Sequence, residues 1–301
     1  MYVITGATGN IGSKTANILL EQGEPVRVIG RDAGRLEPFR ARGAEVAVGD
    51  LKDSDFLTEA FAGATAVYVM IPPHLHTDDF RSFQNFVGAA IANAIRKAKV
   101  RFVVNLSSQG ADLAQGTGPI IGLRDQEQRL NALEGINILH LRPTYFMENL
   151  LMQIPVINRF GFAGSAVRGD QQFAMIATAD IAAHLAQRLL QRNFEGIRVQ
   201  DLLGERDLSL NEAFAVLGNK IGKPDLKYVQ FPYQDAERGM VEMGLSRDLS
   251  RRYIEMSKAL NDGMFAVRRP RVPGTTTPTS IEMFAETFAK AFAASTMGEG
   301  I

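Results

Sequence analysis

The chain has 301 residues, of which 46% are hydrophobic and 22% are charged, a composition typical of a globular protein with one large α/β domain and a smaller lobe. Lys and Arg together number 33, as do Asp and Glu, so no overall field favours nucleic acid or an anionic membrane. Cysteine is absent, which excludes disulfides, thiolate metal sites and a cysteine nucleophile and fits a reducing compartment. Without a leader-like segment or an apolar run of 18 residues, the chain is expected to be cytoplasmic, with no membrane or nucleic-acid partner.

Short β-branched runs alternate with helical patterns through the first half of the chain, which predicts βαβ units around a parallel sheet. The predicted strands are Tyr2–Thr5, Val26–Ile29, Glu45–Val48, Ala66–Met70, Arg101–Leu106 and Asn137–Leu141. The predicted helices are Ile11–Gln22, Ser54–Phe61, Asp79–Lys97 and Gly122–Leu133. Each strand is apolar on both faces, as in a doubly wound sheet that helices cover on both sides.

The pattern is less regular after Pro143, where the sequence predicts a smaller lobe. Strands are expected at Phe173–Ile176, Arg198–Leu202 and Tyr228–Phe231, and helices at 233–262 and 280–293. Asp180 is predicted to cap a helix that ends near Leu190, and Ser209 with Glu212 forms a capping-box pattern. We expect an α/β protein in which residues 1–150 form the larger domain. Residues 151–301 would form a C-terminal α/β lobe for the substrate, with strands partly interleaved with the first domain.

A glycine-rich segment links the first predicted strand to the first predicted helix. It consists of Gly6, Ala7, Thr8, Gly9, Asn10, Ile11 and Gly12. Three glycines at this spacing allow a tight turn, close approach of the backbone to a pyrophosphate, and close packing of helix on strand. The first N–H groups of the helix and its dipole then face the phosphates. This context between strand and helix predicts a dinucleotide-binding domain of the Rossmann type.

The end of the second strand indicates which nicotinamide dinucleotide is bound. Sites for NAD usually carry an acid there, whereas this strand ends in Gly30-Arg31-Asp32, with Arg35 one turn later. An arginine at this place suits a 2′-phosphate, because its guanidinium is a planar double donor. Asp32 is either the ribose acid or the N-cap of a helix over 33–42, and both arginines are alternatively solvated surface charges. We predict a preference for NADP(H) over NAD(H).

Later strand ends supply the other walls of the cofactor site, because ligands of such sheets bind at the carboxyl ends of the strands. The predicted contacts are Asp50 and Leu51 after the third strand, Met70, Ile71 and Pro72 after the fourth, and Pro143 and Tyr145 after the sixth. Ser107 follows the fifth strand, beside the expected nicotinamide.

Several segments together resemble a known protein family. They are GATGNIG, GRD, VGD, NLSSQGA and LRPTYFMENLL in the first half, and FAMIATADIAAHLAQRLL, LLGERDLSLNEAF and YQDAERGMVEMGL in the second. This set resembles the atypical short-chain dehydrogenases, and within them the NmrA-like group. That group includes NADPH-dependent quinone, azo-dye and triphenylmethane-dye reductases as well as cofactor-sensing regulators. The resemblance implies a Rossmann domain with a small C-terminal lobe that closes over the nicotinamide.

The sequence lacks the proton-transfer pair of most short-chain dehydrogenases, a tyrosine with a lysine four residues later. None of the six tyrosines is followed by lysine at that spacing, and Pro119 and Leu123 stand where the pair is expected. No lysine occurs between Lys99 and Lys220. This departure speaks against alcohol oxidation, epimerisation and dehydration. It leaves hydride transfer to an acceptor that needs little acid–base help, or cofactor binding without catalysis.

Three side chains are candidates for positioning a substrate: Ser107, His74 and Tyr145. Ser107, without a neighbouring base in the sequence, is expected to be a hydrogen-bond donor and not a nucleophile, or else to satisfy the strand end. His74 is either substrate-facing or plain loop surface, and Tyr145 either contacts the ring or packs in the core. No metal site is expected, because no carboxylate or thiol cluster supports His74 and His76.

The sequence therefore predicts an NADPH-dependent oxidoreductase that transfers hydride to a small hydrophobic, aromatic or quinonoid acceptor. The alternative is a non-catalytic NADP(H)-binding regulator that senses the redox ratio. Either form is expected to be a monomer or a homodimer.

Overall fold

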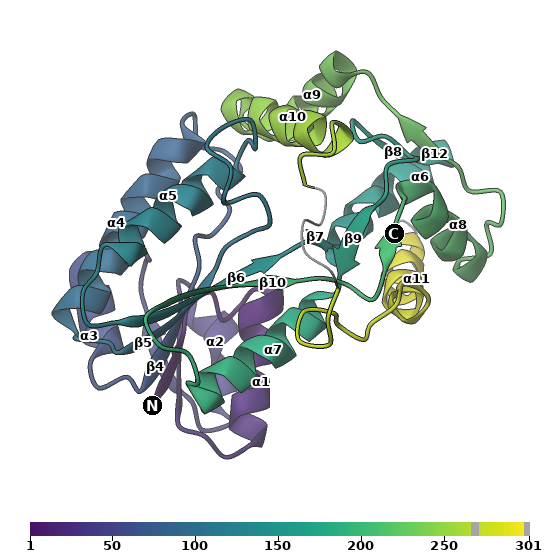
Figure 1. Cartoon of the computed structure of the whole chain (residues 1–301). Coiled ribbons are helices and arrows are strands. Elements are labelled where there is room, and N and C mark those ends of the chain that lie inside the picture. The colour runs from purple at the N-terminus through teal and green to yellow at the C-terminus, as the bar shows by residue number, and fades with distance from the viewer. Residues whose placement is uncertain (266–270, 298–301) are drawn as a thin grey trace.

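A seven-stranded parallel sheet forms the centre of the computed structural model, which describes residues 1–265 and 271–297 (Figure 1). The strand order is β10-β6-β5-β4-β1-β2-β3, and every neighbouring pair is parallel. The strands are β1 (Tyr2–Ile4), β2 (Val26–Gly30), β3 (Glu45–Val48), β4 (Ala66–Val69), β5 (Phe102–Leu106), β6 (Asn137–Pro143) and β10 (Ile197–Leu202). The predicted Rossmann-type doubly wound α/β sheet is confirmed.

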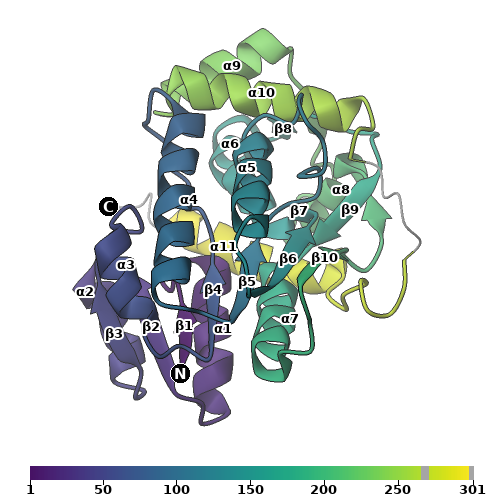
Figure 2. The same ribbon diagram turned by 60° about the vertical axis from the view of Figure 1, so that its left-hand side comes forward.

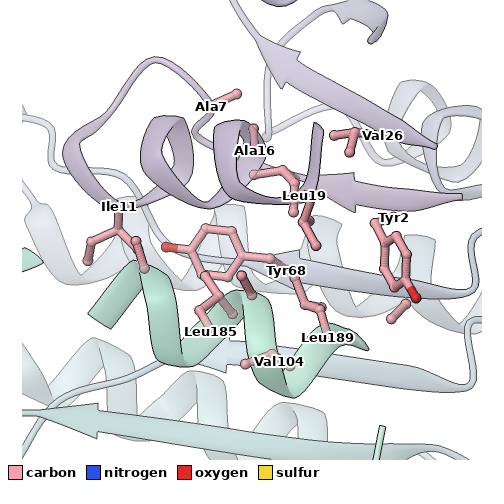
Figure 3. Packing of buried hydrophobic residues seen from close by; sticks show 14 of the residues in the cluster. Tyr2, Ala7, Ile11, Ala16, Leu19, Val26, Tyr68, Val104, Leu185 and Leu189 are labelled. Atoms are coloured by element: carbon pink, nitrogen blue, oxygen red, sulfur yellow. The ribbon is translucent and has the colours of Figure 1, made fainter. Parts of the chain in front are cut away.

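Helices cover both faces of this sheet (Figure 2). One face packs against α1 (Asn10–Glu21), α2 (Ala33–Arg40) and α7 (Thr178–Gln191), and the other against α3 (Ser54–Phe61), α4 (Phe80–Lys97) and α5 (Ile120–Asn131). On the first face Tyr68 of β4 is buried among residues of α1 and α7, including Leu19 and Leu185 (Figure 3). Burial on both faces explains why the central strands β1 and β4 are apolar throughout.

The smaller lobe contains two short sheets. One has the order β11-β9-β7 and the other pairs β12 with β8. Their strands are β7 (Tyr145–Phe146), β8 (Ala163–Ser165), β9 (Phe173–Ile176), β11 (Asp207–Leu208) and β12 (Tyr228–Gln230). The helices are a 3-10 helix (Met147–Gln153), α6 (Ile154–Phe160), α8 (Leu210–Lys220), α9 (Tyr233–Glu242), α10 (Arg247–Asn261) and α11 (Ile281–Met297). The predicted capping box at the start of α8 is present, with Ser209 and Glu212 bonded reciprocally.

The two lobes are not consecutive along the chain. After β9 the chain returns to the large sheet, where α7 packs beside α1 and β10 becomes an edge strand next to β6. The second half therefore supplies one helix and one strand to the Rossmann sheet. Residues 266–270 and 298–301 of the predicted second lobe lie outside the described ranges. Within those ranges, no helix combines the length and apolar character needed to cross a membrane.

The predicted start of α7 is wrong. Asp180 lies inside its first turn, and the carboxylate accepts from the backbone N–H and the hydroxyl of Thr279, at 3.0 and 2.7 Å. The helix begins at Thr178, whose N–H donates to both carboxylate oxygens of Glu148, each at 3.0 Å. A carboxylate 30 residues away thus takes the place of a local N-cap, so the capping pattern around Asp180 misplaced the N-cap by three residues.

Candidate functional site

The glycine loop between β1 and α1 has the geometry of a phosphate cradle. Gly6 has a φ of +59°, and a Cβ added to Gly12 would lie 2.4 Å from the carbonyl oxygen of Gly6. A Cβ on Gly9 would also be close to that oxygen, at 3.3 Å. Gly9 is the N-cap of α1 and makes no side-chain cap hydrogen bond, and the first turn carries no acid. The first N–H groups of α1 are therefore left for an anion, as a dinucleotide pyrophosphate requires.

The residues after β2 show one of the two roles considered for Asp32. Its carboxylate accepts from the backbone N–H groups of Gly34 and Arg35, at 2.8 and 3.2 Å, so it caps α2. Arg35 lies against the glycine loop, with Nη2 donating to the carbonyl of Thr8 at 3.1 Å. Neither Arg31 nor Arg35 forms an ion pair within residues 1–265 and 271–297, and both are exposed. Two uncompensated guanidinium groups thus stand beside the phosphate cradle.

The ends of β3 and β4 border the same loop. Asp50 accepts from the backbone N–H of Lys52 at 2.9 Å, and Leu51 is buried in the core below. Met70 borders the turn, because its sulfur lies 3.1 Å from the position of a Cβ on Gly6. Ile71 and Pro72 are half-buried next to it. The parallel order of the sheet therefore brings the predicted cofactor residues to one edge.

The loop after β4 is fastened to the smaller lobe. His76 Nδ1 is 2.9 Å from the carbonyl of Gly244, and the carbonyl of Leu75 accepts from Ser246 N–H at 2.8 Å. Asp248 of α10 accepts from the N–H of Phe80, at 2.8 Å. These bonds place α10 across the carboxyl edge of the sheet, as Figures 1 and 2 both show. The smaller lobe is thus fastened over the carboxyl edge of the sheet.

His74 and Thr144 each leave a buried polar atom without a partner among the described residues. The ring of His74 packs on Phe83 of α4, with centroids 4.8 Å apart, while its Nδ1 is unpaired. Thr144 directly follows Pro143 at the end of β6, and its Oγ1 is unpaired. Buried polar atoms are normally hydrogen-bonded, so these two fit contacts with a polar ligand group. No group of three metal-ligand side chains occurs in the described ranges.

Ser107 has a neighbour that the sequence did not reveal. Its hydroxyl donates to Glu127 Oε1 at 2.5 Å, and Glu127 also accepts from Arg142 Nε at 2.9 Å and Nη2 at 2.5 Å. Ser107 and Glu127 are only 3% and 5% exposed. Glu127 follows Leu123 by one turn on the predicted helix, so the face that lacks the expected lysine carries a carboxylate instead. That spacing was the one available signal for this residue.

The charge of Glu127 fixes the role of the Ser107 hydroxyl. Burial alone would raise the pKa of Glu127, but the hydrogen bonds from Arg142 and Ser107 outweigh it and leave the pKa below its ordinary value. An ionised carboxylate only accepts hydrogen bonds, so Ser107 commits its proton to Glu127. Toward a ligand, Ser107 then offers lone pairs. The sequence-based expectation of a donor without a neighbouring base therefore does not describe this hydroxyl.

A buried histidine adjoins this cluster. The pKa of His140 is lowered to about 4 by burial, with Glu127 opposing the shift. Its Nδ1 is 3.0 Å from Asn105 Nδ2, and its Nε2 is 2.8 Å from Asn131 Oδ1. This pattern assigns the neutral tautomer that carries its proton on Nε2.

We expect the stability of the protein to fall as the pH falls from about 6.5 to 4. In this window the unfolded chain binds a proton at His140 that the folded chain does not, so stability is full above the window. The expected loss in the free energy of unfolding is about 2–3 kcal/mol, because burial lowers the pKa of His140 from about 6.5 to about 4. Urea unfolding at pH 7.5 and 4.5 measures it, with His140→Gln as the variant that lacks this titration. An equal pH slope in both proteins would contradict the assignment.

Tyr145 and Pro143 lie where β6 passes into the smaller lobe. Tyr145 pairs with Met175 of β9, and its ring is 5.2 Å from that of Phe173. Burial raises the pKa of the Tyr145 hydroxyl above its ordinary value, so it stays protonated. The carbonyl of Pro143 accepts from Gln109 N–H at 3.0 Å. Neither Pro119, which precedes α5 as its N-cap, nor Leu123 offers a proton-transfer group.

Comparisons with known proteins agree with this geometry. The sequence model of the NmrA-like family matches residues 2–268. An NAD(P)H azoreductase from Xenophilus azovorans is 30% identical over 299 residues, which cover 98% of this chain and 100% of that protein. Among solved structures, an NADPH-dependent quinone oxidoreductase from Escherichia coli in complex with NADPH has a TM-score of 0.73 at 22% identity, covering 98% of this chain and 100% of that one.

A triphenylmethane reductase from Citrobacter sp. in complex with NADP(H) has a TM-score of 0.79 at 17% identity, covering 95% of this chain and 99% of that one. At these identities the two solved structures establish the fold alone. The match along residues 2–268 and the full-length azoreductase relative establish the family as well as the fold. The chain belongs to the NmrA-like family.

Proposed function

We propose that the protein is an NADPH-dependent reductase that transfers hydride to a small aromatic or quinonoid acceptor without a Tyr–Lys pair. The observation that carries the proposal is the glycine loop at Gly6–Gly12 beside Arg31 and Arg35, which form no ion pair within the described residues. The names of its relatives support the reaction class, since they include an azoreductase, a quinone oxidoreductase and a triphenylmethane reductase. The first two names state a nicotinamide cofactor, and the third protein has been solved in complex with NADP(H).

The glycine loop and the start of α1 would hold the pyrophosphate of the cofactor. Asp50 and Met70 would border the adenosine half, and Pro143, Thr144 and Tyr145 the nicotinamide half. When bound, NADPH supplies the hydride. Arg31 and Arg35 would bind the 2′-phosphate, because both are exposed guanidinium groups beside the glycine loop and Arg35 donates to the carbonyl of Thr8 within it.

The side chains near the proposed acceptor favour positioning over proton transfer. Ser107 donates to the ionised Glu127, so it would accept a hydrogen bond from an N–H or O–H group of a ligand. Tyr145 stays protonated and presents a ring edge and a donor, and His74 presents an unpaired Nδ1. Acceptors with delocalised charge need little help from a general acid, which agrees with the chemistry of these three side chains. The absence of cysteine supports a cytoplasmic setting, and we propose a monomer or a homodimer there.

A turnover assay tests the reaction. We expect the purified protein to oxidise NADPH in the presence of a quinone, an azo dye or a triphenylmethane dye. The reaction is followed by the loss of the absorbance of reduced nicotinamide at about 340 nm. Heat-unfolded protein is the control for direct reduction. The proposal would be wrong if no acceptor of the panel were turned over. If the protein then bound both NADPH and NADP⁺ tightly and changed its oligomeric mass or its partner on binding, it would be a redox-sensing regulator.

The cofactor preference is tested by Arg31→Ala. Arg31 is exposed and forms no ion pair within the described ranges, so its removal is not expected to disturb the fold. Loss of a charge-assisted bond to the 2′-phosphate should raise the Kd for NADPH about tenfold. The Kd for NADH, which lacks that phosphate, should change less than about twofold. Titration of nicotinamide fluorescence measures both, and equal losses would show that Arg31 does not read the 2′-phosphate.

A further inference from the structure

A second concave site lies at the opposite edge of the large sheet. Its volume is about 550 Å³, and its lining is Leu139, Arg188, Arg192, Asn193, Phe194, Glu195, Arg198, Val199 and Gln200. These residues come from β6, the end of α7 and the start of β10. Arg192 contacts Tyr2, the first residue of β1, which places the cavity at the amino ends of the strands. Figures 1 and 2 show α7 ending on the same side as the N-terminus, away from the glycine loop.

The cavity carries an excess of positive charge. Arg188, Arg192 and Arg198 form no ion pair within residues 1–265 and 271–297, and Glu195 is the only acid in the lining. Neutral groups hold two of the guanidinium groups in place. Arg188 donates to Asn193 Oδ1 at 2.9 Å, and Arg192 donates to the Tyr2 hydroxyl at 2.6 Å. These partners orient the guanidinium groups without compensating their charge, as an anion site requires.

The backbone at Arg192 is also unusual. This residue follows the last turn of α7 in the left-handed conformation, with a φ of +47°, where glycine is the common residue. Its guanidinium lies over the ring of Tyr2, 5.9 Å from the centroid, so the strained residue brings a fixed cation to the cavity wall.

The C-terminal carbonyls of α7 do not explain all three arginines. A cation in the last turn of a helix is favourable, and Arg188 occupies that place. Arg198, however, belongs to the edge strand β10 and is exposed, and it donates a long 3.5 Å bond to the carbonyl of its neighbour Ile197. Its charge therefore remains available to a ligand in the cavity.

Apolar groups complete the wall, because Leu139, Phe194 and Val199 line the cavity together with the arginines. We propose that this cavity binds a small organic anion, with a phosphate or carboxylate group among Arg188, Arg192 and Arg198 and an apolar body against Phe194 and Val199. The site is separate from the cofactor cradle, and its occupancy does not depend on the proposed reaction.

Phenyl phosphate and inorganic phosphate are suitable probes, titrated by calorimetry into the protein with saturating NADPH. We expect saturable binding of phenyl phosphate, and binding at least about tenfold weaker for Arg198→Gln, from the loss of one charge-assisted bond. The exposed Arg198 makes no buried contact, so this variant should keep the wild-type unfolding midpoint. Arg96→Gln, an exposed residue of α4 without an ion pair, is the matched control and should bind as the wild type does.

The signals of His184 locate the probe. Its Nε2 accepts from Arg188 Nε at 3.3 Å, so its imidazole resonances should shift on binding while those of His74 stay unchanged. Saturable binding that Arg198→Gln weakens and Arg96→Gln does not supports the proposal. No saturable binding, equal weakening by both variants, or equal affinity for inorganic phosphate would overturn it.

Discussion

Replacement of Gly12 by alanine is expected to weaken NADPH binding at least about 100-fold, which corresponds to roughly 2.7 kcal/mol. The added Cβ would lie 2.4 Å from the Gly6 carbonyl oxygen and 3.0 Å from that of Thr5. Both neighbours are backbone atoms, so the clash is relieved only if the start of α1 moves away from the end of β1. That movement displaces the N–H groups that would bind the pyrophosphate. Fluorescence titration with NADPH measures the loss.

Gly239→Ala is the matched control for this variant. Gly239 lies within α9, where an added Cβ has no heavy atom within 4 Å. Alanine is the better helix former, so the control should keep its affinity for NADPH and unfold at the same or a slightly higher temperature. If Gly12→Ala is folded and binds NADPH as the wild type does, the loop is not the pyrophosphate site.

Glu127→Gln is expected to lower the free energy of unfolding by about 3–4 kcal/mol. The side chain of Arg142 is only 15% exposed and pairs with Glu127 at 2.5 Å. Removal of the carboxylate charge takes away the main compensation of a largely buried guanidinium, because the remaining carboxyl of Asp112 is 3.8 Å from Arg142. Urea unfolding at pH 7.5 measures the effect, well above the range in which Glu127 titrates.

The exposed pair Arg251–Glu237 offers the comparison, with side chains 70% and 33% exposed. Glu237→Gln should change the free energy of unfolding by less than about 0.5 kcal/mol, because solvent screens such pairs. A loss below about 1 kcal/mol for Glu127→Gln would show that the buried cluster does not stabilise the fold. In Glu127→Gln an amide oxygen replaces the carboxylate and accepts from Ser107 more weakly, so a change in acceptor KM would link the cluster to the proposed site.

Local patterns in the sequence were sufficient to predict several features of both lobes. The glycine spacing at Gly6, Gly9 and Gly12 follows directly from backbone sterics, and the capping box at Ser209 is complete within four residues. The apolar strands fixed the doubly wound sheet, because a strand that is apolar on both faces has to be covered on both. In the same way Asp32 was recognised as a possible cap, and the structure shows its two bonds.

The tertiary structure alone decided which side chains that are far apart in the sequence are in contact. Ser107 and Glu127 are 20 residues apart, and the start of α7 is set by Glu148, 30 residues earlier. The return of β10 to the edge beside β6 likewise depends on packing and not on a local signal. A helix propensity or a cap depends on residues within about one turn of the chain. Whether a charge can be buried depends instead on the partner that the fold brings near it. The sequence by itself thus determined the cradle for the dinucleotide, while the fold determined the electrostatics around the proposed acceptor.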